Sequence, residues 1–278
     1  MKRKPLAELR AAGLYLVLTA IACVMLVPFV HVVLGGFKSQ GEFISDPGAW
    51  LPTSFTNVDN YVGLFTDHEF GVYLRNSFIV SGVAVVTNVL FGSMCGYALA
   101  KLPFRGKRII FVLVLGGMML PYVAMVVPQF LIVVQLGLVD TLAGIVIPLI
   151  VAPLSVFIMR QYAESIPDEL LEAARIDGAG EYRTFFQVFL PLTGPALATV
   201  GILSFLNSWN IFMWPLVVAQ SQGTYTAPVG LAVASQASNT IDYGLLLAGS
   251  LVVLLPVVLL YLFLQRYVVQ GVAATGIK

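Results

Sequence analysis

The residues of this chain best suited to specific recognition are Glu-Ala-Ala-Arg-Ile-Asp-Gly at 172–178, followed after nine residues by Val-Phe-Leu-Pro at 188–191. They form the longest charge-rich segment of a chain that is otherwise almost wholly apolar. Alanines allow a helix to approach another surface closely, and a glycine fixes where that helix ends. The pattern predicts a rigid docking surface, although an amphipathic loop that only anchors a membrane protein has a similar pattern.

The sequence offers little that could perform covalent chemistry. His31 and His68 are far apart, no Cys/His cluster has metal-ligand spacing, and no Ser/His/Asp set lies in or near the apolar runs. Cys23 and Cys95 both lie in apolar runs, so we expect no disulfide. The phosphate-loop pattern Gly-x-x-x-x-Gly-Lys-Ser/Thr is absent. We therefore expect no catalytic residue, no metal and no cofactor on this chain.

Composition indicates a membrane protein. The 278 residues are 59% hydrophobic and 10% charged, against roughly 25% charged in a soluble domain. The net charge of +1 gives no reason to expect a nucleic-acid partner. Six apolar runs without Asp, Glu, Lys or Arg approach or exceed the roughly 20 residues that cross a bilayer. These runs are about 11–36, 76–100, 109–134, 141–159, 192–218 and 244–265.

The sequence thus predicts an all-α integral membrane protein with six transmembrane helices and one domain, residues 1–278. Of the 15 Lys and Arg residues, all except Lys38 and Arg75 fall on one side of the predicted membrane. Positive residues favour the cytoplasmic side, so both termini and the segment 161–191 are expected there. The external segments are then 37–75, 135–140 and 219–243.

The cytoplasmic segment 161–191 is predicted to be a helix–turn–helix. Ser165 is the expected N-cap of its first helix, with Pro167 and Asp168 in the first turn. Gly178 and Gly180 are expected to end that helix through left-handed backbone geometry, and a second helix begins near Glu181. The expected apolar face of the first helix comprises Ile166, Leu170, Ala173 and Ala174. The expected apolar face of the second comprises Tyr182, Phe185, Val188 and Phe189.

This segment resembles the EAA loop of ABC-importer permeases, whose pattern is Glu-Ala-Ala, three residues, Gly, nine residues and Ile-x-Leu-Pro. Here Val188 stands in place of the isoleucine. The flanks Ile-Pro-Asp-Glu-Leu at 166–170 and Ile-Asp-Gly-Ala at 176–179 are similar to the carbohydrate-importer branch, specifically its maltose-type second permease. Further matching stretches make the resemblance cover most of the chain. They are 73–77, 208–210, 214–216 and 265–267.

The resemblance implies a transmembrane permease subunit of an ATP-driven, binding-protein-dependent importer, for a sugar or oligosaccharide, in a bacterial or archaeal plasma (inner) membrane. The implied partners are a second homologous permease, two ATP-binding subunits that hold ATP and Mg, and an extracytoplasmic solute-binding protein. The residues implied to couple to the ATPase are Glu172, Ala173, Ala174 and Gly178, which would dock on it, and Asp177, which would help to fix the helix break. The tail residues implied to lie near it are Gly271, Thr275 and Lys278, although Ala273 and Thr275 depart from the family's Gly-Leu-Thr-Ala-Gly-like run.

Neutral polar residues within the apolar runs mark a candidate translocation path, because hydroxyl-rich sugars are bound by neutral donors, acceptors and aromatic rings. The candidates are Asn88, Tyr122, Gln129, Asn207, Trp209 and Asn210. The alternative role for each is structural, since polar residues also join membrane helices through hydrogen bonds.

Other functions stay open on the sequence alone. A polyol or a glycerol phosphoester is an alternative substrate, although a phosphoester would favour Arg or Lys in the path. A sodium-coupled secondary transporter is a further alternative. Proton coupling is disfavoured, because it usually requires an ionisable group within the membrane. A membrane enzyme or assembly factor would need a catalytic set of residues that this sequence does not contain.

Overall fold

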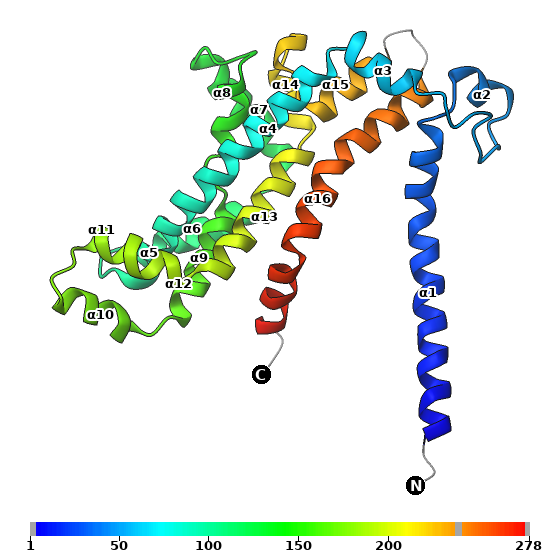
Figure 1. Cartoon of the computed structure of the whole chain (residues 1–278). Coiled ribbons are helices and arrows are strands. Elements are labelled where there is room, and N and C mark those ends of the chain that lie inside the picture. The colour runs from blue at the N-terminus through cyan, green and yellow to red at the C-terminus, as the bar shows by residue number, and fades with distance from the viewer. Residues whose placement is uncertain (1–3, 237–240, 276–278) are drawn as a thin grey trace. The chain divides into compact units, whose positions relative to one another are not determined.

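The computed structural model describes residues 4–236 and 241–275, with side chains over 10–236 and 241–263. Over these residues the chain forms helices and no strand, which confirms the all-α prediction. The chain divides into two compact units, one of residues 1–69 with 231–254 and the other of residues 70–230 with 255–278. Figure 1 labels the helices of both units.

The first unit contains α1 (Lys4–Gly35), α2 (Gln40–Ser45), α3 (Asp59–Thr66) and the beginning of α16 (Tyr243–Thr275). The Asn60 side chain donates hydrogen bonds to two backbone carbonyls just after α1, at 2.9 and 2.8 Å. Gln40 bonds the backbone of Ile241 at 2.8 Å and of Tyr243 at 3.0 Å. The segment between α1 and α3 is thus fastened to the beginning of α16.

The second unit contains the remaining helices. One continuous helical run consists of α4 (Phe70–Thr87), the π-helical turn η1 (Asn88–Gly92) and α5 (Ser93–Lys101). Next come α6 (Lys107–Met119), α7 (Tyr122–Gln135), α8 (Leu142–Val146), the 3₁₀ turn η2 (Ile147–Leu149) and α9 (Pro153–Ser165). The predicted cytoplasmic segment holds α10 (Asp168–Ile176), α11 (Glu181–Thr184), the π-helical turn η3 (Phe185–Phe189) and α12 (Leu190–Leu192). After α12 the chain continues with α13 (Gly194–Asn210), α14 (Met213–Val218), η4 (Gln222–Thr224) and α15 (Ala227–Ala234). The last four residues of α15 belong to the first unit.

Prolines decide where several helices end. Leu120, Ala152 and Ile166 each precede a proline and are extended, with ψ of 127°, 135° and 128°. Proline clashes with a helical conformation of the preceding residue, so each of these positions is a helix boundary. Pro128 and Pro256, by contrast, lie inside α7 and α16.

Among the described residues, four helical segments are long and apolar enough to cross a membrane, and the number becomes six if each of two bent helix pairs is one span. The first pair, α6 with α7, bends by 107°. The run predicted over 109–134 is therefore broken at Leu120. The run predicted over 192–218 is also wrong at its end, because α13 stops at Asn210 and α14 is a separate helix. The second bent pair joins Glu181–Leu192 to α13 at 82°.

Two apolar clusters hold the second unit together. One surrounds Trp214, whose indole N–H donates to Ile145 O at 3.1 Å, and includes residues of α7, α8 and α14. The other, which we call the loop cluster, consists of Tyr97, Met159, Ala163, Ile166, Leu171, Phe185, Phe189, Ala196 and Val200. Within this unit, α8 and α14 lie at one end and α10, α11 and α12 at the other (Figure 1).

Candidate functional site

The beginning of α10 is tied to the end of α5. Asp168 and Glu169 occupy the first turn of α10, where carboxylates favourably meet the positive end of the helix dipole. Lys101, the last residue of α5, donates from Nζ to Ile166 O at 2.6 Å and to Asp168 Oδ1 at 2.5 Å. The hydrogen bond and the charge of Lys101 hold the pKa of Asp168 below its usual value.

The predicted N-cap of α10 is wrong. Ser165 is the last residue of α9, and its hydroxyl donates to Tyr162 O at 2.7 Å. Pro167 takes the N-cap position and provides no side-chain cap. Pro167 forces Ile166 into an extended conformation, so α9 ends at Ser165. α10 begins at Asp168, two residues later than a cap at Ser165 would place it.

The predicted apolar face of α10 is also shifted. Leu171 is 1% exposed and packs in the loop cluster, whereas Leu170 is 47% exposed. The buried face thus lies one residue, or about 100°, round the helix from the predicted one. This shift leaves Glu172 and Ala173 exposed and Ala174 half-buried.

The end of α10 is built as predicted around Gly178, which has φ of +81°. The N–H groups of Gly178 and Ala179 donate to Arg175 O and Ala174 O, each at 3.0 Å. This pair of bonds is the Schellman arrangement, which requires a left-handed residue at the position of Gly178. Asp177 is the C-cap of the helix. Gly180, which was expected to share the left-handed role, has φ of −71° and instead precedes α11 as its N-cap.

Glu181 joins three helices. Its Oε2 accepts a hydrogen bond from the Tyr97 hydroxyl of α5 at 2.9 Å. Its Oε1 accepts from Arg175 Nε of α10 at 3.0 Å, which is also an ion pair. The turn between α10 and α11 is therefore closed by a carboxylate that is held from the α5 side as well.

The second helix of the loop packs through aromatic rings. Phe185 and Phe189 are buried, and their ring centroids lie 5.4 and 4.7 Å from that of Tyr97. Tyr182, predicted on the same face, is 77% exposed. The π-helical turn begins at Phe185, so the regular helical period that would align Tyr182 with Phe189 does not hold. Tyr182 and Ile176, which is 85% exposed, add apolar area to the outer surface of the loop.

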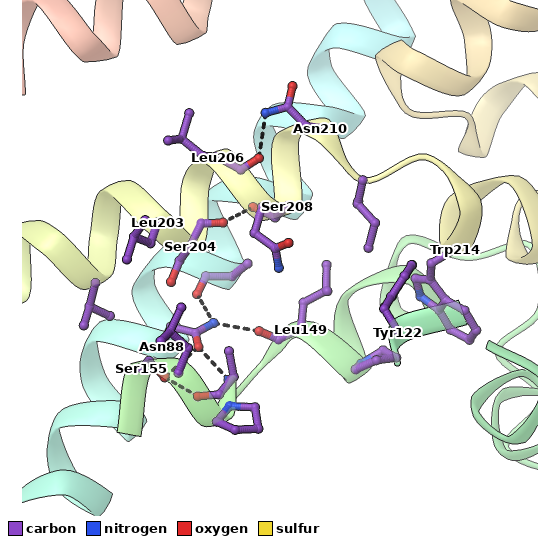
Figure 2. Close-up of a pocket in the computed structure, with 18 of the residues that line it drawn as sticks. Asn88, Tyr122, Leu149, Ser155, Leu203, Ser204, Leu206, Ser208, Asn210 and Trp214 are labelled. Atoms are coloured by element: carbon purple, nitrogen blue, oxygen red, sulfur yellow. Dashed lines mark hydrogen bonds between the residues drawn. The ribbon is translucent and has the colours of Figure 1, made fainter. Parts of the chain in front are cut away.

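A cavity of about 770 Å³ lies elsewhere in the second unit, between α4, α7, α9 and α13 (Figure 2). Five of the six predicted path residues line it, namely Asn88, Tyr122, Gln129, Asn207 and Asn210. Ser155, Ser204 and Ser208 add hydroxyl groups, and the remaining lining residues are apolar or aromatic. Within the part of the chain that the structure describes, no charged side chain lines this cavity. The cavity therefore presents neutral donors and acceptors between apolar walls.

The polar lining residues differ in their hydrogen bonding. Both the Nδ2 and the Oδ1 atoms of the Asn88 amide make hydrogen bonds within the protein. Asn210 Nδ2 donates to Leu206 O at 2.8 Å, and Ser208 Oγ donates to Ser204 O at 2.6 Å (Figure 2). The half-buried side chain of Gln129 and the exposed side chain of Asn207 have no such bond among the described contacts, so their amides can meet a molecule in the cavity.

Trp209 is the predicted path residue that the structure puts elsewhere. It is 1% exposed and lies outside the cavity lining. Its ring stacks on Phe205 with centroids 5.3 Å apart and meets Phe78 at 4.8 Å. Trp209 therefore joins α13 to α4. On a helix Trp209 is about 100° from Asn210 and about 200° from Asn207, so its side chain points in a different direction from both.

The described residues contain no group of three or more His, Cys, Asp or Glu side chains that could hold a metal ion. Of the predicted tail residues, the backbone of Gly271 and Thr275 continues α16. Their side-chain surroundings, and Lys278 altogether, lie outside the described residues.

Sequence reasoning missed Lys101, Leu171 and the role of Glu181. From the sequence, Lys101 was only one of the positive charges that indicate which side of the membrane is cytoplasmic. Leu171 differs from Leu170 only in its position within the helical period, so the starting residue of α10 had to be known first. Glu181 meets Tyr97 across 84 residues of sequence, a pairing that no local pattern signals.

Comparison with known proteins agrees with this architecture. The family model described as binding-protein-dependent transport system inner membrane component matches residues 88–274. The arabinooligosaccharides transport system permease protein AraQ of Halalkalibacterium halodurans is 42% identical over 93% of each chain. The trehalose/maltose transport system permease protein MalG of Thermococcus litoralis is 32% identical over 94% of each chain.

A crystal structure of a bacterial ABC transporter involved in the import of the acidic polysaccharide alginate contains a chain of the same fold. Its TM-score is 0.80 at 24% identity, covering 96% of this chain and 99% of that one. The present chain belongs to the family of binding-protein-dependent transport system inner membrane components. It is a membrane-embedded transport permease subunit and not an enzyme.

Proposed function

We propose that this chain is the transmembrane permease subunit of an ATP-driven importer for a sugar or oligosaccharide. It couples ATP hydrolysis on a separate ATPase to alternating access of the cavity. The observation that carries this function is the α10–α11 loop. Gly178 ends α10, Glu181 bonds Arg175 across the turn, and Leu171 is buried in the loop cluster. The loop therefore has a rigid outer surface that contains Glu172 and Ala173.

The outer surface of the loop fits a protein partner. Ile176 and Tyr182 are large apolar side chains that the loop itself does not bury, next to the charge of Glu172 and the small Ala173. Apolar side chains at the core of a patch with a polar rim are typical of protein interfaces. We assign Glu172, Ala173, Ala174, Asp177 and Gly178 to contact with the ATPase, on which ATP and Mg are bound.

The cavity supports a neutral, hydroxyl-rich substrate. Its free amides at Gln129 and Asn207 can pair with hydroxyl groups, and Tyr122 offers an aromatic ring. Its lining has no Lys or Arg to neutralise a phosphate, which disfavours a glycerol phosphoester more than a polyol. The names of the relatives, which include arabinooligosaccharide and trehalose/maltose transport systems, support a saccharide.

The proposed assembly contains a second homologous permease, two ATP-binding subunits and an extracytoplasmic solute-binding protein. The placement of Lys and Arg supports cytoplasmic termini in a bacterial or archaeal inner membrane, with residues 161–191 on the same side. We treat the two compact units as parts of one permease domain, residues 1–278, because α15 and α16 each run through both.

Co-purification tests this function. The wild-type chain, extracted from membranes, should bring down an ATPase and a second permease. Gly178→Asp and Glu172→Lys should lose the ATPase and keep the permease, while Gly180→Ala should keep both because Gly180 has an ordinary φ and open space around its Cβ position. A wild-type chain that purifies alone and transports with an ion gradient after reconstitution would overturn the proposal in favour of a secondary transporter.

A further inference from the structure

We propose that Asn88 is a positioning residue: its side-chain amide holds open the break between α8 and α9, a wall of the cavity, and does not contact the transported molecule. The proposal starts from the position of Asn88. It is the first residue of the π-helical turn η1, and it is 2% exposed.

The break between α8 and α9 is caused by Pro153. In a continuous helix, the carbonyl of Leu149 would accept a hydrogen bond from the N–H of residue 153, but proline has none. Ala152, which precedes Pro153, is extended with ψ of 135° and lies outside the helix, and its N–H donates to a side chain and not to a helical carbonyl. One carbonyl and one N–H are therefore left without helical partners.

Asn88 supplies both missing partners. Its Nδ2 donates to Leu149 O at 2.7 Å, and its Oδ1 accepts from Ala152 N–H at 2.7 Å (Figure 2). Nδ2 also donates to Ala84 O at 2.8 Å, and the Ser155 hydroxyl, whose proton is shared with Ala152 O at 2.6 Å, lies 3.0 Å from Oδ1. An asparagine amide has two N–H donors and about two acceptor positions, so these four bonds use its whole capacity.

The requirement for these bonds follows from the surroundings. Inside a bilayer, unpaired backbone groups are tolerated only where protein or water satisfies them. Close packing fixes the geometry further: a Cβ on Gly92 would lie 2.7 Å from Ser155 Oγ, so the two helices touch one turn after Asn88. Leu149, Ala152, Pro153 and Ser155 all line the cavity, so the amide of Asn88 sets the shape of that wall.

The decisive variant is Asn88→Leu, which keeps the approximate volume and removes all four bonds. We expect the maximal transport rate to fall about tenfold or more, because two buried backbone groups lose their partners. Amide exchange at Ala152 should accelerate. The milder Ser155→Ala removes one donor to Oδ1 and should lower the maximal rate by about two- to fivefold.

Two comparisons complete the test. Thr87→Val changes the neighbouring side chain, whose hydroxyl bonds only carbonyls of its own helix, and should leave both the rate and the exchange at Ala152 unchanged. Asn207→Ala should raise KM. If Asn88→Leu instead raises KM as Asn207→Ala does, with unchanged exchange at Ala152, then Asn88 contacts the substrate and the proposal is wrong. The transport measurement rests on the proposed import function, whereas amide exchange at Ala152 does not. The two measurements therefore distinguish failure of the proposed import function from failure of the proposed role of Asn88.

Discussion

The Tyr97 hydroxyl donates a 2.9 Å hydrogen bond to Glu181 Oε2, and this contact joins α5 to the helical loop that follows α9. Four residues further along α5, Lys101 bonds the chain just before α10. The end of α5 therefore holds the chain just before and just after α10. A displacement of α10 and α11 by a bound partner would be passed to α5 without a flexible connection between them.

Loss of the Tyr97–Glu181 bond should weaken coupling more than folding. Tyr97→Phe and Glu181→Gln are expected to lower the free energy of unfolding by about 1 kcal/mol or less, because Glu181 is partly exposed and its bonds are screened. We expect both variants to keep ATP hydrolysis in the assembled transporter while transport per ATP falls. Parallel assays of hydrolysis and uptake check this. Equal loss of both activities would argue against the role of this bond in coupling.

Substitution of Gly178 should weaken ATPase binding even where the new side chain does not disturb the contact itself, because the backbone conformation at this position is left-handed. At φ of +81° a side chain costs about 1–2 kcal/mol, so Gly178→Ala should loosen the end of α10 and reduce ATPase retention. Gly178→Asn should be milder, since asparagine tolerates left-handed geometry. Gly180→Ala is the matched control two residues away. Binding of the purified ATPase to each variant measures the effect, and identical retention by Gly178→Ala and Gly180→Ala would contradict it.

The contact of α5 with α9 depends on Gly96. A Cβ at this position would lie 2.6 Å from Met159 Cβ and 2.7 Å from the backbone nitrogen of Arg160. Gly96→Ala should therefore force the helices apart and cost about 1–3 kcal/mol. Gly82→Ala, in the same helical run, meets nothing within 4 Å and serves as the control. Thermal unfolding of the detergent-solubilised protein should separate the two variants, and equal melting temperatures would refute the predicted clash.

Substitutions of Asn207 and Trp209 should have different effects, one on transport and the other on stability, although the two residues are only two positions apart. Trp209→Ala removes a buried ring between Phe78 and Phe205 and should cost about 3–5 kcal/mol in stability. Asn207→Ala should leave the melting temperature nearly unchanged and raise the KM for the transported sugar. The test is to measure both quantities for both variants. Reversed effects would show that the cavity is not the transport path.

Acid should loosen the contact between the turn at Asp140 and residues 220–224. The pKa of Asp140 is lowered, first by the hydrogen bond from the Gln220 N–H and then by Ser221. A lowered pKa means that the contact stabilises the fold above the ordinary value of 3.8 and is lost as pH falls through the lower folded value. Amide exchange over residues 220–224 should therefore rise on acidification below about pH 4 in the wild type. In Asp140→Asn, which keeps an acceptor oxygen, the same exchange should depend less on pH.

Much of the architecture follows from residues close together in sequence. The apolar runs, the positive charges and Gly178 predict the helical class and the end of α10, because each acts through its immediate neighbours. The roles of Leu171 and Trp209 could not be predicted, since each depends on the rotation of its helix. Asn88 was identified as polar and intramembrane, but its partners are set by a helix break 61 or more residues away.

The bond network at Asn88 should make positions 88 and 153 depend on each other in related permeases. A lineage that replaced Pro153 would restore a helical donor for Leu149 and leave the asparagine with redundant polar groups. A lineage that replaced Asn88 first would strand the carbonyl of Leu149 and the N–H of Ala152. Each single step is worse than the double one, so asparagine and proline at these positions should be gained and lost together among related permeases.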